Sequence, residues 1–93
     1  MSETTTKIRP IVVGGKPVAN YALAVATRIG EAETTIVLRA RGRFISSAFD
    51  AANKAINMNL PVKRGEVRWG QETAPGGEKK VSFVELTLIG KED

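Results

Sequence analysis

The chain has no cysteine and no histidine among its 93 residues. Without cysteine there is no disulfide bond, no thiolate metal ligand and no thiol nucleophile. Without histidine the chain lacks the commonest general base and the commonest metal ligand. An enzyme would have to rely on lysine or carboxylate chemistry, so we expect a protein that is not an enzyme and that uses no metal or cofactor.

Long apolar runs are also missing, since no stretch approaches the roughly 20 apolar residues that cross a bilayer. The segment 1–9 is polar and lacks the apolar stretch of a signal peptide. We therefore expect no membrane partner, a cytoplasmic location and a flexible N-terminus over 1–9. The length and the 42% hydrophobic content indicate one globular domain over 1–93, small enough to gain from a homodimer interface.

Positive charge is concentrated in the first half of the chain. The net charge is +4, and residues 1–43 carry seven basic against three acidic side chains, whereas residues 44–93 carry seven of each. This asymmetry is typical of a basic face for a polyanion. Ordinary solubilising charge explains the composition equally well.

Hydrophobic periodicity predicts the element order β-α-β-α-β-β. The expected strands are 11–13, a buried run, and 34–40, 62–71 and 79–89, and the expected helices are 18–29 and 44–58. Along 34–40 the side chains should alternate between two faces, with Ile36, Leu38 and Ala40 on one and Thr35, Val37 and Arg39 on the other. The first helix should have Pro17 in its first position and end at Gly30. This order predicts an α/β fold, a two-layer α+β sandwich in which a mixed four-stranded sheet carries both helices on one face.

Helical spacing also predicts which side chains of the two helices face the core. The expected core positions are Val18, Ala22, Val25, Ile29, Ile45, Ala48, Phe49, Ala52, Ala55 and Ile56.

The topology predicts where the basic side chains gather. Two β-α-β crossovers make the first three strands parallel, so the loops after them leave from one edge of the sheet. That edge receives Lys16, Arg41, Arg43, Lys79 and Lys80, where open α/β sheets bind ligands. Neither helix begins with a Ser, Thr, Asp or Asn cap, so its leading N–H groups suit phosphate, unless backbone or water satisfies them.

The Gly-Gly-Lys sequence at 14–16 does not match a nucleotide loop. The phosphate loop of NTPases needs four residues between its glycines and a Ser or Thr after the lysine, where this chain has Pro17. The dinucleotide pattern lacks its third glycine.

The last two predicted strands form a long hairpin with a polar tip over 72–79. Residues 67–76 span roughly 30 Å when extended, and a β-ribbon of that length can enter a groove. Arg68, Lys79 and Lys80 favour such a contact, Glu72 and Glu78 oppose it, and a floppy loop is the alternative. The hairpin's apolar residues exceed what one sheet face needs, which favours a homodimer: Val67, Trp69, Phe83, Val84 and Leu86. We expect Trp69 and Phe83 in the core or dimer surface rather than stacked on bases.

Two motifs carry a family resemblance. Gly-Lys-Pro-Val-Ala-Asn-Tyr at 15–21 and Ala-Arg-Gly-Arg-Phe-Ile-Ser at 40–46 resemble the two signature loops of the Alba family, and the likeness extends over 11–89. The resemblance implies a fold like the C-terminal domain of translation initiation factor 3, assembled as a homodimer. It also implies binding of double-stranded DNA and RNA with little sequence preference. The matching contact residues are Lys16, Asn20, Tyr21, Arg41 and Arg43.

The chain departs from the family pattern at two positions. Many relatives have two lysines in the first loop, where this chain has Gly15 and then Lys16. Lys16 alone is therefore the candidate for the family's regulatory acetylation, in which an acetyltransferase adds the acetyl group and a deacetylase removes it. Asn59 stands where some relatives carry a Phe that packs dimer against dimer along DNA. The sequence therefore does not decide whether dimers of this chain form cooperative filaments.

The resemblance leads to one main hypothesis and to alternatives. The main one is archaeal chromatin packaging and DNA condensation on the chromosome. The first alternative is a dedicated RNA-binding protein of the ribonuclease P-associated type. A small enzyme that acts on a phosphorylated substrate and a module that binds acidic proteins are the remaining hypotheses.

Overall fold

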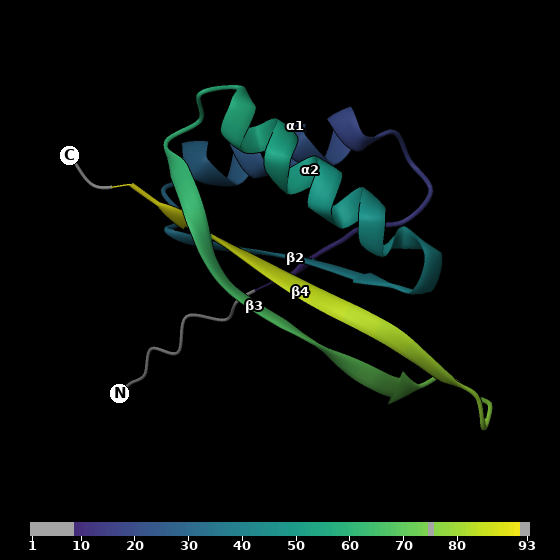
Figure 1. Cartoon of the computed structure of the whole chain (residues 1–93). Helices are drawn as coiled ribbons and strands as arrows, with labels where there is room; N and C mark the ends of the chain where they lie inside the picture. The colour runs from purple at the N-terminus through teal and green to yellow at the C-terminus, as the bar shows by residue number, and fades with distance from the viewer. Residues whose placement is uncertain (1–8, 75, 92–93) are drawn as a thin grey trace, which may run out of the picture.

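The fold is a sheet of four strands with two helices packed on one of its faces, as the computed structural model of residues 9–74 and 76–91 shows (Figure 1). The elements are β1 (Ile11–Val12), α1 (Val18–Gly30), β2 (Thr35–Arg41), the 3₁₀ turn η1 (Gly42–Phe44), α2 (Ile45–Asn57), β3 (Val62–Thr73) and β4 (Lys80–Gly90). The predicted two-layer α+β sandwich is confirmed. No helix in the described ranges is long and apolar enough to cross a membrane.

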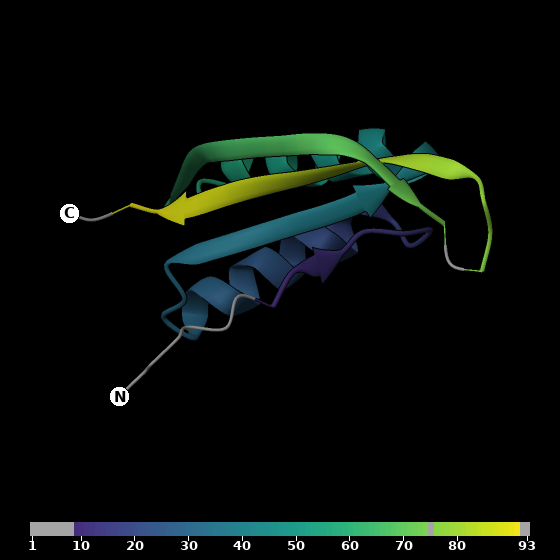
Figure 2. The ribbon, with the colours of Figure 1, turned by 90° about the horizontal axis from the view of Figure 1, so that it is seen from below.

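The strand order in the sheet is β1-β2-β4-β3. β1 runs parallel to β2, and β4 runs antiparallel to both of its neighbours, so β1, β2 and β3 all point the same way (Figure 2). The loops that follow β1 and β2 therefore leave from the same edge as the β3–β4 turn. This confirms the topology predicted from the two crossovers.

The core lies between the sheet and the helices. Along β2 the side chains alternate, with Ile36, Leu38 and Ala40 buried under the helices and their neighbours on the open face. α2 carries four buried alanines, and such small side chains let it lie close to the strands and to α1. Full burial of a leucine such as Leu38 or Leu88 stabilises the fold by about 1.5–3 kcal/mol.

Element boundaries differ from the prediction by at most two residues. Pro17 precedes α1 as its N-cap instead of occupying the first helical position. Gly30 is the last residue of α1, and Ala32, at φ 64°, makes the turn that Gly30 was expected to make. α2 begins at Ile45 because the chain first makes the η1 turn, which Gly42 enters at φ 55°, a conformation that favours glycine.

Two apolar side chains predicted to be buried are exposed. Phe49 is 43% exposed because the alanines of α2, and not Phe49, meet the sheet. Val12 is 71% exposed because it lies on the open face of the sheet, which no helix covers. Four predicted core residues of the helices are only half-buried: Val18, Ile29, Ile45 and Ile56.

The hairpin is longer than predicted, since β3 and β4 stay paired up to Thr73 and Lys80, and its turn begins at residue 74 instead of 72. β2 ends opposite Phe83, so beyond that point the two strands continue without a third (Figure 2). We call this two-stranded extension, residues 71–82, the arm; Pro75 lies outside the described residues.

β3 is interrupted by a bulge between Arg64 and Val67. A Cβ on Gly65 would lie 2.8 Å from Cδ1 of Ile89, so only glycine lets Ile89 pack against this part of the bulge.

The predicted flexible N-terminus falls mostly on residues 1–8, which lie outside the described residues. Arg9, its last residue, forms an ion pair with Glu33 at 3.0 Å.

Candidate functional site

The loops after β1 and β2 lie next to each other at one edge of the sheet. We call residues 14–16 and 41–44 the loop edge. A Cβ on Gly15 would lie 4.0 Å from the Phe44 ring, so the two loops nearly touch. The Tyr21 hydroxyl holds the first loop in place, because it accepts hydrogen bonds from the backbone N–H of Gly14 at 2.8 Å and of Lys16 at 3.2 Å.

Both helices begin at this edge without a side-chain cap. No side chain in the described part of the chain bonds to the first N–H groups of α1, whose N-cap is Pro17, or of α2, whose N-cap is Phe44. The first turn of neither helix carries an acidic residue. Backbone carbonyls satisfy part of these groups, since the N–H of Ile45 bonds to the Gly42 carbonyl and that of Asn20 to the Pro17 carbonyl. The positive end of each helix dipole and the N–H groups without such a partner still favour an anion here.

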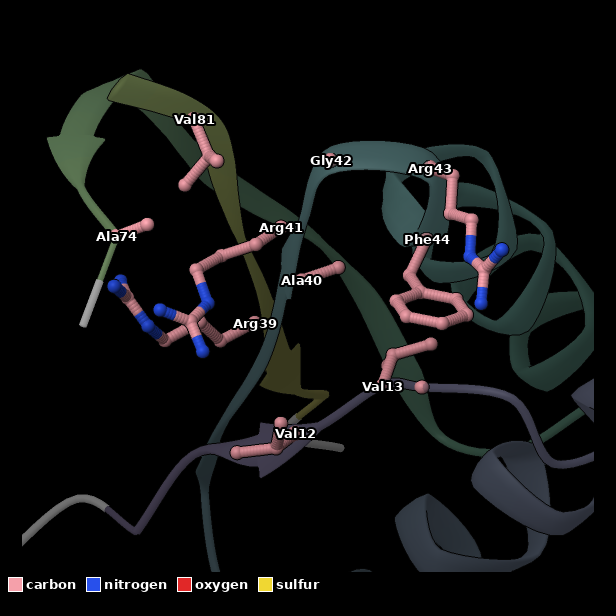
Figure 3. A pocket seen from close by; sticks show the side chains of 11 residues that line it. Val12, Val13, Arg39, Ala40, Arg41, Gly42, Arg43, Phe44, Ala74 and Val81 are labelled. Carbon is pink, nitrogen blue, oxygen red and sulfur yellow. The ribbon is translucent and has the colours of Figure 1, made fainter. Parts of the chain in front are cut away.

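An open hollow of about 700 Å³ lies at the loop edge, with arginines and apolar residues in its walls (Figure 3). Arg39 and Arg41 point to one side of β2 toward Ala74, and Arg43 lies on the opposite side over Phe44 (Figure 3). The lining residues are Val12, Val13, Gly14, Arg39, Ala40, Arg41, Gly42, Arg43, Phe44, Ala74 and Val81.

Arg43 is exposed and stacks on an aromatic ring. Its guanidinium carbon lies 5.0 Å from the centre of the Phe44 ring, a cation–π distance that leaves the outer face of the guanidinium open to solvent. No described carboxylate forms an ion pair with it. Arg43 is therefore available to an anion.

Arg39 is held on the open face of the sheet by two carboxylates. It donates to Glu72 at 2.5 Å and to Glu85 at 2.6 Å, and it lies 4.9 Å from the centre of the Phe83 ring. The hydrogen bond to Glu72 raises the pKa of Arg39 above its ordinary value; partial burial acts in the opposite direction, and Glu85 adds to the rise. Arg41 makes a looser ion pair with Glu72 at 3.4 Å.

The structure brings most of the predicted contact residues to this end of the molecule. Lys16, Arg41 and Arg43 are exposed on the loop edge, and Asn20 is exposed in the first turn of α1. Lys79 and Lys80 are exposed at the base of the turn in the arm.

Tyr21 and Arg68 have different surroundings. Tyr21 is 8% exposed and lies behind the first loop, which gives it a supporting position. Arg68 lies further back on the open face, where it pairs with Glu85 at 3.4 Å.

Sequence reasoning missed two contributors to the hollow. The sequence places Arg39 on the face of its strand opposite Ile36 and Leu38, but we did not count it among the site residues, although a period of two puts it on the same face as Arg41. Phe44 was assigned to the second helix, but it lies in η1 and supports Arg43.

Comparison with known proteins identifies the family of this chain. DNA/RNA-binding protein Alba of Thermoplasma volcanium is 41% identical over 81 residues, which are 84% of this chain and 91% of that protein. DNA/RNA-binding protein Alba 1 of Archaeoglobus fulgidus is 38% identical over 84 residues, 87% of this chain and 94% of that protein. The chain belongs to the Alba family. No family model matches it, so the assignment rests on these relatives.

Solved structures agree with the family assignment. Alba from Thermoplasma volcanium superposes with a TM-score of 0.79 at 38% identity and covers 87% of this chain and 99% of that one. ALBA1 from Trypanosoma brucei gives the same TM-score at 11% identity, over 95% of this chain and 74% of that one. The second likeness shows the fold alone.

A second surface of this Alba chain is apolar. In register with the buried Val84 and Leu86, Trp69 and Val67 of β3 point to the helix side of the sheet, where Phe49 of α2 lies. These three side chains, which we call the apolar patch, are 79%, 49% and 43% exposed. They line a hollow of about 570 Å³ beside α2.

Proposed function

We propose that this member of the Alba family binds double-stranded DNA and RNA through the loop edge, without reading sequence. The observation that carries the proposal is the convergence of two uncapped helix N-termini with Lys16, Arg41 and Arg43 on one edge of the sheet. The relatives at 38–41% identity are named DNA/RNA-binding proteins, which supports it.

The chemistry of the loop edge suits phosphate. Its polar groups are backbone N–H groups and basic side chains, and both bind the sugar–phosphate backbone that every duplex shares. Phosphate contacts carry no base information, so affinity follows the number of neutralised phosphates and falls with salt. In the proposed complex Lys79 and Lys80 of the arm contact the same duplex, and the arm lies along its groove.

The proposed assembly is a homodimer joined through the apolar patch. An indole that is 79% exposed beside an exposed phenylalanine and valine is typical of a protein interface. A second copy of the chain fits because the small fold gains buried apolar area that it lacks as a monomer. Two copies would present two loop edges and two arms to one duplex.

In the cell we propose chromatin packaging and DNA condensation on the cytoplasmic chromosome. Lys16 is exposed on the loop edge, so an acetyltransferase could reach its amine. Acetylation would remove a positive charge from the phosphate site, and a deacetylase would restore it. A dedicated RNA-binding role uses the same surface, and crosslinking in cells followed by identification of the bound nucleic acid would distinguish the two. The relatives' names support a binding protein rather than an enzyme.

A gel-shift titration tests the proposed function directly. Two DNA duplexes of unrelated sequence and one RNA duplex are titrated with the protein at low and at moderate salt. We expect the DNA affinities to agree within about threefold and all affinities to fall steeply with salt. No shift of any duplex at low salt would overturn the proposal.

A further inference from the structure

The two arginines of β2 share one carboxylate of the arm. Arg39 and Arg41 are two residues apart on one strand, so their side chains lie on the same, open face of the sheet. Glu72 lies on β3 past the point where β2 ends, and its carboxylate reaches back to both. One oxygen accepts from Arg39 at 2.5 Å, and the other lies 3.4 Å from Arg41.

The two halves of this bridge differ in strength. The Arg39 side is short and partly buried, with side-chain exposures of 26% for Arg39 and 28% for Glu72. Glu85 holds Arg39 from a second direction at 2.6 Å. The Arg41 side is long, and the Arg41 side chain is 47% exposed. Exposed ion pairs of this length contribute little to stability, so Glu72 can leave Arg41 while it stays on Arg39.

We propose that Glu72 is an internal competitor for the phosphate that binds Arg41, and that it thereby sets the affinity of the loop edge. The proposal rests on the proposed function. When a duplex binds, a phosphate oxygen takes the place of the Glu72 oxygen on Arg41, and Glu72 remains bonded to Arg39. No covalent bond changes in this exchange.

Glu72 acts on Arg41 in two ways. It occupies the guanidinium in the free protein, and it repels a phosphate at Arg41, since the two anions then lie well within a Debye length of about 8 Å. Arg43 on the other side of the hollow has no ion pair with a described residue. The loop edge thus has one free arginine and one that a carboxylate competes for.

A double-mutant cycle on the full-length protein tests the exchange. Duplex affinity is measured at one salt concentration for the wild type, Glu72→Gln, Arg41→Gln and the double variant. Glu78→Gln is the matched control, because it removes the same charge from the exposed turn of the arm. We expect Glu72→Gln to tighten binding about threefold to fivefold when Arg41 is present and less than about twofold when it is absent. Glu78→Gln should tighten binding less than about twofold in both backgrounds.

The outcomes separate this proposal from the proposed function. Equal tightening by Glu72→Gln with and without Arg41 would show a general charge effect and overturn the competition. Weaker binding of a folded Glu72→Gln, with an unchanged thermal unfolding midpoint, would show that Glu72 positions Arg41 and would also overturn it. A wild type that binds no duplex overturns the proposed function itself.

Discussion

The loop edge and the apolar patch are both exposed, yet they offer opposite chemistry. The loop edge consists of short loops with backbone N–H groups and basic side chains, at the ends of β1 and β2. The apolar patch consists of Phe49, Val67 and Trp69 on the side of α2 and β3. The difference would let one small fold hold the proposed polyanion site and the proposed dimer interface on separate elements.

The two surfaces would depend on each other in an assembled protein. If the patch joins two copies, each duplex meets two loop edges at once, and the second binding event becomes intramolecular. Changes at the patch should then alter binding more than any change of one charge at the loop edge. The relative size of these effects on duplex affinity can be measured.

The largest effect is expected from Trp69→Asp. A buried carboxylate in an apolar interface is costly, so the variant should be monomeric, and duplex affinity should fall about 100-fold through lost avidity. Light scattering gives the mass and a gel shift gives the affinity. Leu23→Asp is the matched control, since Leu23 is 62% exposed on α1, outside the patch. A wild type of about 10 kDa at micromolar concentration, the mass of one chain, would refute the dimer.

A smaller effect is expected at the loop edge. Lys16→Ala and Arg43→Ala should each weaken binding about fivefold to tenfold for every duplex sequence, and each should lower the slope of log affinity against log salt by about 0.9. The mass should stay that of the wild type. Lys63→Ala removes an exposed charge at the far end of β3 and should change affinity less than about twofold. An Arg43→Ala variant with wild-type affinity would refute the loop-edge assignment.

The arm is expected to contribute less than the loop edge. The backbone N–H of Ala74 donates to the carbonyl of Lys79. Hydrogen-bonded pairs recur every two residues along an antiparallel ladder, so Glu72 and Val81 also form one. An Asn-Gly turn in place of residues 73–80 can therefore close the hairpin at that pair. We expect this short-arm protein to bind about threefold more weakly than a full-length protein in which Glu78, Lys79 and Lys80 are all glutamine.

The two arm variants carry the same net charge, so their difference measures the arm's geometry. The central loops remain in both, so binding should weaken without vanishing. Equal affinities would mean that the arm acts through its charges alone, and tighter binding of the short-arm protein would mean that the arm obstructs the duplex.

The sequence predicts the layers of this fold well, because alternation in β2 records which face is buried. Ile36 and Leu38 are expected to share one face of the strand, and that face is the covered one, where they are 1% and 0% exposed. Helical spacing is less informative, since it shows which residues share a side and not how much of that side the sheet covers. Phe49 was therefore placed in the core, whereas it lies at the margin of α2.

The site was predictable where it depends on topology and not where it depends on register. Parallel β1, β2 and β3 place the basic loops together, and this follows from the order of elements. The bridge from Arg39 and Arg41 to Glu72 depends on β4 lying between β2 and β3 in one particular register. No sequence pattern gives that register. The same holds for the hydrogen bonds that Tyr21 makes to a loop five to seven residues earlier.

The smallest effect on binding is expected from Tyr21→Phe, and it distinguishes a supporting residue from a contact residue. The variant keeps the buried ring and removes the acceptor for the N–H groups of Gly14 and Lys16. The free energy of unfolding should fall by about 1 kcal/mol, which a thermal melt detects in a domain of this size. Duplex affinity should fall only about twofold, because the first loop loses its anchor while Lys16 keeps its charge.

The salt dependence of binding shows whether the twofold loss in the Tyr21→Phe variant reflects a supporting role or a lost contact with the duplex. A supporting role leaves the number of phosphate contacts unchanged, so the slope of log affinity against log salt should equal that of the wild type. Thr27→Val is the control, because it removes a hydroxyl that donates to the Leu23 carbonyl at 3.0 Å on an exposed part of α1. A Tyr21→Phe protein with wild-type stability and a shallower slope would instead place the hydroxyl on the duplex, and the loop edge would then extend to Tyr21.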